Sequence, residues 1–300
     1  MSQKTKAHLA VFFTNLFFAC NYSMVKYISP SLIKPYALNL VRVGVSVLLF
    51  WLVWAMGKTM KSGMKTEPGI KKEHWFRFAL CSLTGVAINQ MLFIKGLTLT
   101  STIHVSLLIL CTPLMITIFA SWILKEKVTA AKIIGIASGI GGSVLLILAK
   151  ESSEHAENYL LGDLLIIINA LSYAFYFILV KPLMKVYHPV HVIRWVFTIG
   201  LFMMIPFCWV QFSEVQWQQF DLSQFASLGF IVIAATFLAY YFNVYGILHL
   251  GAGVAGSYIY TQPIFAVIIA RVFLNEPLNF QKIIAGVLIF FGVFLVSRKK

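Results

Sequence analysis

The sequence predicts an all-α membrane protein of about ten transmembrane helices, arranged as two inverted repeats of five helices each. Hydrophobic residues make up 60% of the 300-residue chain and charged residues only 11%, whereas a typical soluble domain has about 25% charged residues. A span needs about 20 apolar residues, so this length leaves room for about ten spans and short connections. An internal duplication supplies the third observation.

Apolar runs between clusters of charged and turn residues mark the expected helices in order. These runs are 8–28, 36–56, 75–94, 99–124, 132–149, 161–181, 191–211, 225–246, 252–274 and 281–297. The first run follows Lys4 and Lys6, as in a signal peptide, but we expect it to be retained because a later helix matches it. The longest connection, 57–74, is too short to form a domain.

The formal net charge of +14 comes largely from residues in the gaps between apolar runs, so it predicts topology and no nucleic-acid partner. If the N-terminus is cytoplasmic, most lysines and arginines flank cytoplasmic helix ends. The acidic residues then expected outside are Glu151, Glu154, Glu157, Asp163, Glu214, Asp221 and Glu276. We expect a multi-pass protein of the cell inner (cytoplasmic) membrane with both termini in the cytoplasm.

The duplication is visible in segments 96–127 and 246–277, which align without a gap at an offset of 150 residues. This alignment matches Gly96 with Gly246, Pro113 with Pro263, and Glu126 with Glu276. A looser match, at an offset of 155, pairs the first helix with the sixth. Because each copy contains an odd number of spans, the repeats 8–149 and 161–297 are expected to face opposite ways, an arrangement that recurs in secondary transporters.

Each repeat has a glycine, a stretch of small residues, a mid-helix proline and a helix end at Leu-Lys-Glu-Lys (124–127) or Leu-Asn-Glu-Pro (274–277). Together with Arg42 in the second helix, this pattern resembles the EamA-like permeases of the drug/metabolite transporter superfamily. The resemblance covers nearly the whole chain and implies a permease that works by alternating access, with amino acids or related metabolites as substrates. The small multidrug resistance proteins of the same superfamily carry a glutamate in the first helix, which is lacking here, so export of cationic drugs by that route is not expected.

Polar residues within spans mark the expected substrate site, because their burial in lipid is costly. Pro113 and Pro263 are expected to kink their helices near the membrane centre, and Thr112 and Gln262 precede them at equivalent positions. The helical spacing places His104 on the face of Thr112, and Tyr258 on that of Gln262. Further candidates are Asn15, Asn89, Tyr173, Tyr176 and Asn243. For any one of them, hydrogen bonding between neighbouring helices is the alternative role.

Three charged residues are candidates for a gate or an anchor. Arg42 can bind helix carbonyls or a substrate carboxylate. Glu126 and Glu276 close the two matching helices, where each either gates the pathway or lies in a solvated turn.

We therefore expect a secondary transporter or facilitator that exports a small organic metabolite as its two halves rock about a central site. No nucleotide-binding loop is present, and neither a cofactor nor a metal is expected. The expected partners are the small-molecule substrate and membrane lipids, and a homodimer is compatible with the sequence. Two alternatives stay open: a flippase for a lipid-linked headgroup and, less favoured, an intramembrane enzyme, for which the spans offer no paired catalytic residues.

Overall fold

A computed structural model describes residues 2–59, 69–123, 130–148, 158–250, 258–275 and 278–297, and these ranges contain helices and no strand. The first repeat begins with α1 (Gln3–Ile28) and α2 (Pro35–Thr59). A third span consists of the 3-10 turn η1 (Lys72–His74), α3 (Trp75–Ser82), the π-helix η2 (Leu83–Ala87) and α4 (Ile88–Leu99). A broken fourth span follows as α5 (Thr102–Leu108) and α6 (Cys111–Ile123), and α7 (Ala130–Leu148) is the fifth.

The second repeat begins with α8 (Tyr159–Val186) and α9 (Pro189–Ser213). After the short turn η3 (Trp217–Gln219) comes a span made of α10 (Leu222–Gly229), the π-helix η4 (Phe230–Leu238) and α11 (Ala239–Leu250). The ninth span is described from η5 (Tyr258–Thr261) through α13 (Gln262–Phe273), and α14 (Phe280–Ser297) is the last.

These segments confirm the helical membrane fold expected from the apolar runs. Six helical stretches are long and apolar enough to cross a membrane, and four shorter apolar helices, 102–116, 133–145, 262–273 and 280–292, lie where the other spans are expected. Both repeats contain a π-helical stretch in their third span, η2 and η4, and the two stretches overlap at an offset of 150 residues. The duplication therefore extends to local backbone irregularities.

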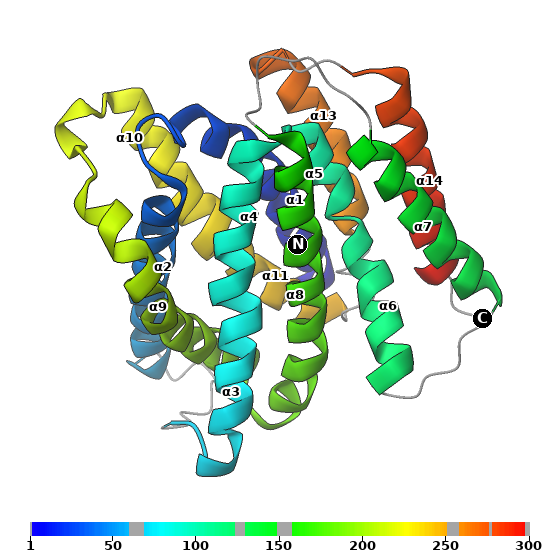
Figure 1. The fold of residues 1–300 in the computed structure, drawn as a ribbon. Helices are drawn as coiled ribbons and strands as arrows, with labels where there is room; N and C mark the ends of the chain where they lie inside the picture. Colours follow the sequence, from blue (N-terminus) through cyan, green and yellow to red (C-terminus); the bar gives the residue numbers. More distant parts are fainter. Residues whose placement is uncertain are drawn as a thin grey trace.

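The two repeats are interleaved. The most extensive helix contacts join different repeats: α7 with α14, α2 with α9, α4 with α8, and α1 with α11. Figure 1 shows α7 and α14 side by side at one flank of the bundle, and α2 and α9 at the opposite flank. The largest interfaces of the bundle thus lie between the two repeats, and the rocking of two five-helix halves stays a prediction that this packing does not test.

Equivalent residues make equivalent bonds between the repeats. Thr14 of α1 donates to the Ala239 carbonyl (3.2 Å), and Asn169 of α8 donates to the Asn89 carbonyl (2.7 Å). The donors are 155 residues apart and the acceptors 150, the two offsets of the duplication. The structure thus has a pseudo-twofold relation between its halves, as expected for inverted repeats.

Glycines hold α7 against α14 at close range. A Cβ atom added at Gly292 would lie 2.4 Å from the Gly135 carbonyl oxygen, and one at Gly142 would lie 2.8 Å from the Ala285 carbonyl oxygen. Gly142 and Gly292 are equivalent in the duplication. Small residues let the two backbones approach, as is common between membrane helices.

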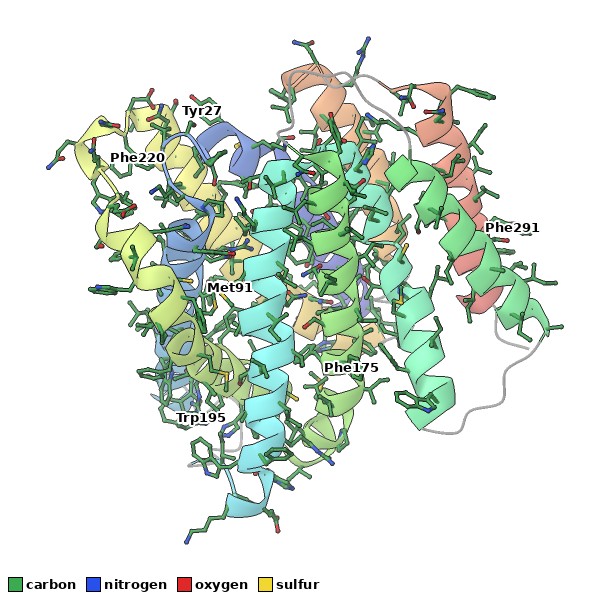
Figure 2. The ribbon with its side chains drawn as sticks, viewed as in Figure 1. Tyr27, Met91, Phe175, Trp195, Phe220 and Phe291 are labelled. Atoms are coloured by element: carbon green, nitrogen blue, oxygen red, sulfur yellow. The ribbon has the colours of Figure 1, made fainter. Side chains whose placement is uncertain are left out.

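The bundle has two ends that its contacts define. At one end, labelled by Tyr27 in Figure 2, the Tyr27 hydroxyl bonds Ser223 (2.9 Å), and Lys34, in the connection that follows α1, forms an ion pair with Glu214 (2.6 Å). The lower end holds aromatic contacts of Trp195 with Trp51 and Trp75. Figure 2 labels Tyr27 at the upper end and Trp195 at the lower end.

Candidate functional site

A buried polar cluster links the two repeats through Gln262, the first residue of α13. Its side-chain nitrogen donates to the Asn15 side-chain oxygen (2.7 Å), and its own oxygen accepts from the Tyr22 hydroxyl (2.8 Å). Gln262 is 5% exposed and both of its partners on α1 are also buried. Of the predicted site residues, Gln262 and Asn15 are therefore brought together, in a cluster that Tyr22 completes.

A second polar contact lies on the pseudo-twofold axis. The Gln90 side chain of α4 donates to the Tyr240 hydroxyl of α11 (2.8 Å). Tyr240 lies 150 residues after Gln90, so the two residues occupy equivalent positions in the two repeats. Each therefore contacts its own counterpart from the other repeat. Contacts of this kind occur only where a twofold axis passes between the two copies.

Three tyrosines gather beside this axis. The rings of Tyr173 and Tyr176 lie 5.6 Å apart, and both tyrosines are within electrostatic range of Tyr240. The Tyr176 ring rests on Gly85 of η2, where a Cβ atom would lie 2.4 Å from the ring. All three side chains keep part of their surface accessible. Aromatic rings with a few hydrogen-bonding groups suit a small amphipathic solute.

Arg42 is the one predicted gate or anchor residue that the structure describes. It is 2% exposed, and its Nε donates to the Thr236 hydroxyl of η4 (3.1 Å), so it links the second span of one repeat to the third span of the other. Glu126 and Glu276 lie outside the described residues.

His104 is not part of the central group. Its Nδ1 lies 2.8 Å from the Asp163 carboxylate, which also accepts from the Thr100 hydroxyl (2.5 Å). Both His104 and Asp163 are 0% exposed. The sequence does not predict this burial: the Thr100 and His104 side chains, at the break between two spans, draw the Asp163 carboxylate into the bundle. That Asp163 lies toward the outer side of the membrane stays a prediction. The fourth span is also interrupted between Leu108 and Cys111, so one helical face does not carry both His104 and Thr112.

The two prolines also differ from expectation. Pro113 and Pro263 lie in the first turn of α6 and α13, after a break or a 3-10 turn, and not in the middle of a kinked helix. A proline at this position loses no hydrogen bond, because the first backbone N–H groups of a helix have no intrahelical acceptor. Thr112 is buried in α6, which packs on α8, whereas Gln262 bonds to α1, so these equivalents do not form one site.

The remaining predicted residues are dispersed. Asn89 and Asn169 are bonded to each other's carbonyls, which joins α4 to α8. The Tyr258 hydroxyl bonds His8 near the lower end (2.8 Å). Asn243 is half-buried in α11, and no side-chain bond from it to another described residue is recorded.

Sequence reasoning missed the partners in these contacts. Tyr22, Thr236 and Tyr240 do not differ in the sequence from other residues of their spans. Only Tyr240 could have been identified, because it is equivalent to Gln90 at the offset of 150 residues. Among the described residues, no group of histidines, cysteines and acids is arranged to hold a metal ion.

Comparison with known proteins matches this arrangement to one family. The profile described as the EamA-like transporter family matches residues 5–148 and 160–298. An uncharacterized transporter of Archaeoglobus fulgidus is 23% identical over 99% of each chain. The uncharacterized transporter YetK of Bacillus subtilis is 25% identical over 85% of this chain and 76% of its own. A WAT1-related protein of Arabidopsis thaliana is 24% identical over 99% of this chain and 87% of its own.

A solved crystal structure shares the fold. It superposes with a TM-score of 0.65 over 98% of this chain and 97% of its own, at 16% sequence identity. A likeness at this identity describes the arrangement of the helices and not the substrate.

Proposed function

The chain belongs to the EamA-like transporter family, and from this premise we propose that it is a secondary transporter or facilitator that exports a small organic metabolite, an amino acid or a related compound, by alternating access. The proposed setting is the cytoplasmic membrane, with both termini in the cytoplasm. The similar proteins are named as transporters and not as enzymes, so transport and not catalysis is the activity of the family.

The observation that supports this proposal is the layer of uncharged polar side chains where the repeats interleave. Gln262, Asn15 and Tyr22 satisfy one another between α13 and α1, and Gln90 bonds Tyr240 on the pseudo-twofold axis. Burying such groups in a membrane protein is costly, so they need a structural or a functional reason. A solute that exchanges its own hydrogen bonds with theirs gives a functional one.

The interleaving restricts how the protein changes shape. Because α1 packs on α11 and α13, and α8 packs on α4 and α6, a motion that separates the repeats would expose the largest interfaces. We propose that the moving units are instead mixed groups of helices from both repeats. The breaks at α5–α6 and the π-helices η2 and η4 are the places where helices can bend, since irregular turns often act as hinges.

Counterflow in proteoliposomes tests the proposal. Purified protein would be reconstituted and loaded with each amino acid in turn, and entry of a radiolabelled trace of the same solute would be measured. We expect Gln262→Ala to reduce counterflow by about 10- to 100-fold, because the change leaves Asn15 and Tyr22 without their partner. Thr112→Val serves as the comparison at the equivalent position. Absence of counterflow for every solute in the wild type would contradict the proposed function.

A further inference from the structure

Arg42 is a buried cation with no counter-ion in the part of the chain that the structure describes. It lies in the third turn of α2 and is 2% exposed, and no carboxylate among the described residues lies within ion-pair distance of it. The buried carboxylate of Asp163 already bonds His104 and Thr100. Since an unpaired charge inside a membrane protein is costly, its retention needs a reason.

The guanidinium group is held in one orientation. Its Nε donates to the Thr236 hydroxyl (3.1 Å), and that hydroxyl donates in turn to the Ile231 carbonyl (2.7 Å), a bond across five residues within the π-helix η4. The Nη1 atom of Arg42 is buried and has no hydrogen-bond partner. The Nε side of the guanidinium is therefore fixed, whereas the terminal nitrogen Nη1 can still donate a hydrogen bond to a ligand.

A second buried arginine is stabilised by aromatic rings, although its Nε and Nη1 also have no hydrogen-bond partner. Arg194 of α9 is 1% exposed, and its guanidinium carbon lies 4.4 Å from the ring centre of Trp51 and 4.1 Å from that of Trp54. Aromatic faces of this kind compensate a cation. Among the described residues no aromatic ring lies over the Arg42 guanidinium, and the group that its Nε contacts is a neutral hydroxyl.

Polar and aromatic residues linked to one another lie near Arg42 in sequence or in electrostatic range of it. Asn39 lies one helical turn before Arg42, donates to the Gln90 carbonyl (3.0 Å), and has a buried side-chain oxygen without a partner. Tyr240, bonded to Gln90, lies within electrostatic range of Arg42, and its ring packs against Phe197 at 4.9 Å. A free donor, a free acceptor and aromatic walls thus occur within one region of the bundle.

We propose that Arg42 binds the carboxylate of the transported solute, and that the solute is a small amino acid-like zwitterion whose ammonium group donates to the Asn39 oxygen. The inference rests on the proposed transport function and narrows its substrate class. The carboxylate replaces the missing counter-ion of Arg42, and a guanidinium fork matches the two carboxylate oxygens in geometry as well as in charge.

Wild-type protein gives the first test, without any mutation. For each amino acid that shows counterflow, the corresponding carboxamide and the corresponding decarboxylated amine would be added as competitors. We expect the acid to compete at least about tenfold better than either analogue, because a hydrogen bond to a charged group contributes about 1.5–3 kcal/mol. Equal competition by the acid and its carboxamide would overturn the assignment of the carboxylate while leaving the transport function intact.

Substitution at Arg42 gives the second test. We expect Arg42→Gln to weaken the apparent affinity for the acid about 10- to 100-fold and to remove the preference for the acid over its carboxamide. Arg42→Lys keeps the charge but loses the fork, so part of the preference should remain. Arg271→Gln, at an exposed arginine on α13, is the matched control and should retain the wild-type preference.

Folding is monitored by the thermal midpoint in detergent, with and without millimolar amino acid. A folded Arg42→Gln protein that still prefers the acid would contradict the proposal. If Arg42→Gln does not fold, competition in the wild type decides the question. Absence of counterflow in the wild type for every amino acid would instead contradict the transport function itself.

Discussion

The two ends of the bundle use matching positions for different chemistry. At an offset of 155 residues, His8 of α1 corresponds to Asp163 of α8. Each bonds a residue from a broken span of the other repeat: Asp163 bonds His104 of α5, and His8 bonds Tyr258 of η5. The first pair is fully buried, whereas His8 is exposed and Tyr258 is half-buried.

His8 and Asp163 are equivalent, but their partners are not, because at the offset of 150 residues His104 corresponds to Val254 and Tyr258 to Leu108. Each repeat thus joins this position of its first helix to the other repeat through a different residue, and the two bonds differ in burial. A buried pair of ionisable groups resists separation, because each group loses its partner in an apolar setting. An exposed hydrogen bond exchanges with water at little cost. The contact between His104 and Asp163 is thus expected to be the firmer of the two, and with the proposed orientation it lies toward the outer end.

The largest expected effect is at Asp163. Asp163→Ala leaves His104 and Thr100 without their shared acceptor, so we expect a loss of about 3–5 kcal/mol of stability, as is usual when one partner of a buried pair is removed. The measurement is the thermal midpoint or denaturant unfolding in detergent. A thermal midpoint equal to that of the wild type would mean that the stability of the protein does not depend on this pair.

Thr100→Val sharpens the comparison by removing one hydrogen bond and keeping the pair. The Thr100 hydroxyl donates to the carboxylate at 2.5 Å, and a hydrogen bond to a charged group contributes about 1.5–3 kcal/mol. We expect a loss of stability in this range, smaller than that of Asp163→Ala. Thr98→Val is the control, since the Thr98 hydroxyl bonds only the Lys95 carbonyl one turn earlier. Equal losses for the two threonine variants would remove the special role given to the carboxylate.

At the lower end, Tyr258→Phe removes the hydroxyl that bonds His8. Because this bond lies near the surface, we expect a loss of about 0.5–1.5 kcal/mol, measured in the same unfolding experiment. A loss as large as that of Asp163→Ala would show that the two ends are equally firm and would break the comparison.

The smallest effect is expected at Lys34 and Glu214, an ion pair at the upper end that is half-exposed on both sides. Glu214→Gln should change stability by about 0–1 kcal/mol, with the effect shrinking in high salt. A loss of stability as large as that of Asp163→Ala would show that the exposed ion pair stabilises the upper end as much as the buried pair does.

The fold could be predicted because its determinants are local or repeated. Runs of about 20 apolar residues specify spans without reference to tertiary contacts. The ungapped match of Gly96 and Pro113 with Gly246 and Pro263 then predicts the second copy. Where a helix breaks is less local: Pro113 indicates a disruption, but the break itself falls at Leu108–Cys111, a few residues before it.

The candidate site could be predicted only in part, because hydrogen-bond partners depend on tertiary packing. Polarity within a span identified Gln262 and Asn15, which the structure joins. It also identified His104, but not its partner: Asp163 lies only four residues after the start of α8, where a carboxylate ordinarily faces water. No pattern in the sequence distinguishes a terminal acid that is solvated from one that is drawn inward.

The bond between Gln90 and Tyr240 bears on the history of the chain. In a symmetric pair of identical, unfused subunits, a residue on the dyad faces a copy of itself, so one amino acid must serve as both donor and acceptor. Once the two genes were joined, the positions could mutate separately. A glutamine facing a tyrosine is an asymmetric pair that two identical copies cannot form, and it gives the two sides of the midpoint different shapes and polarities.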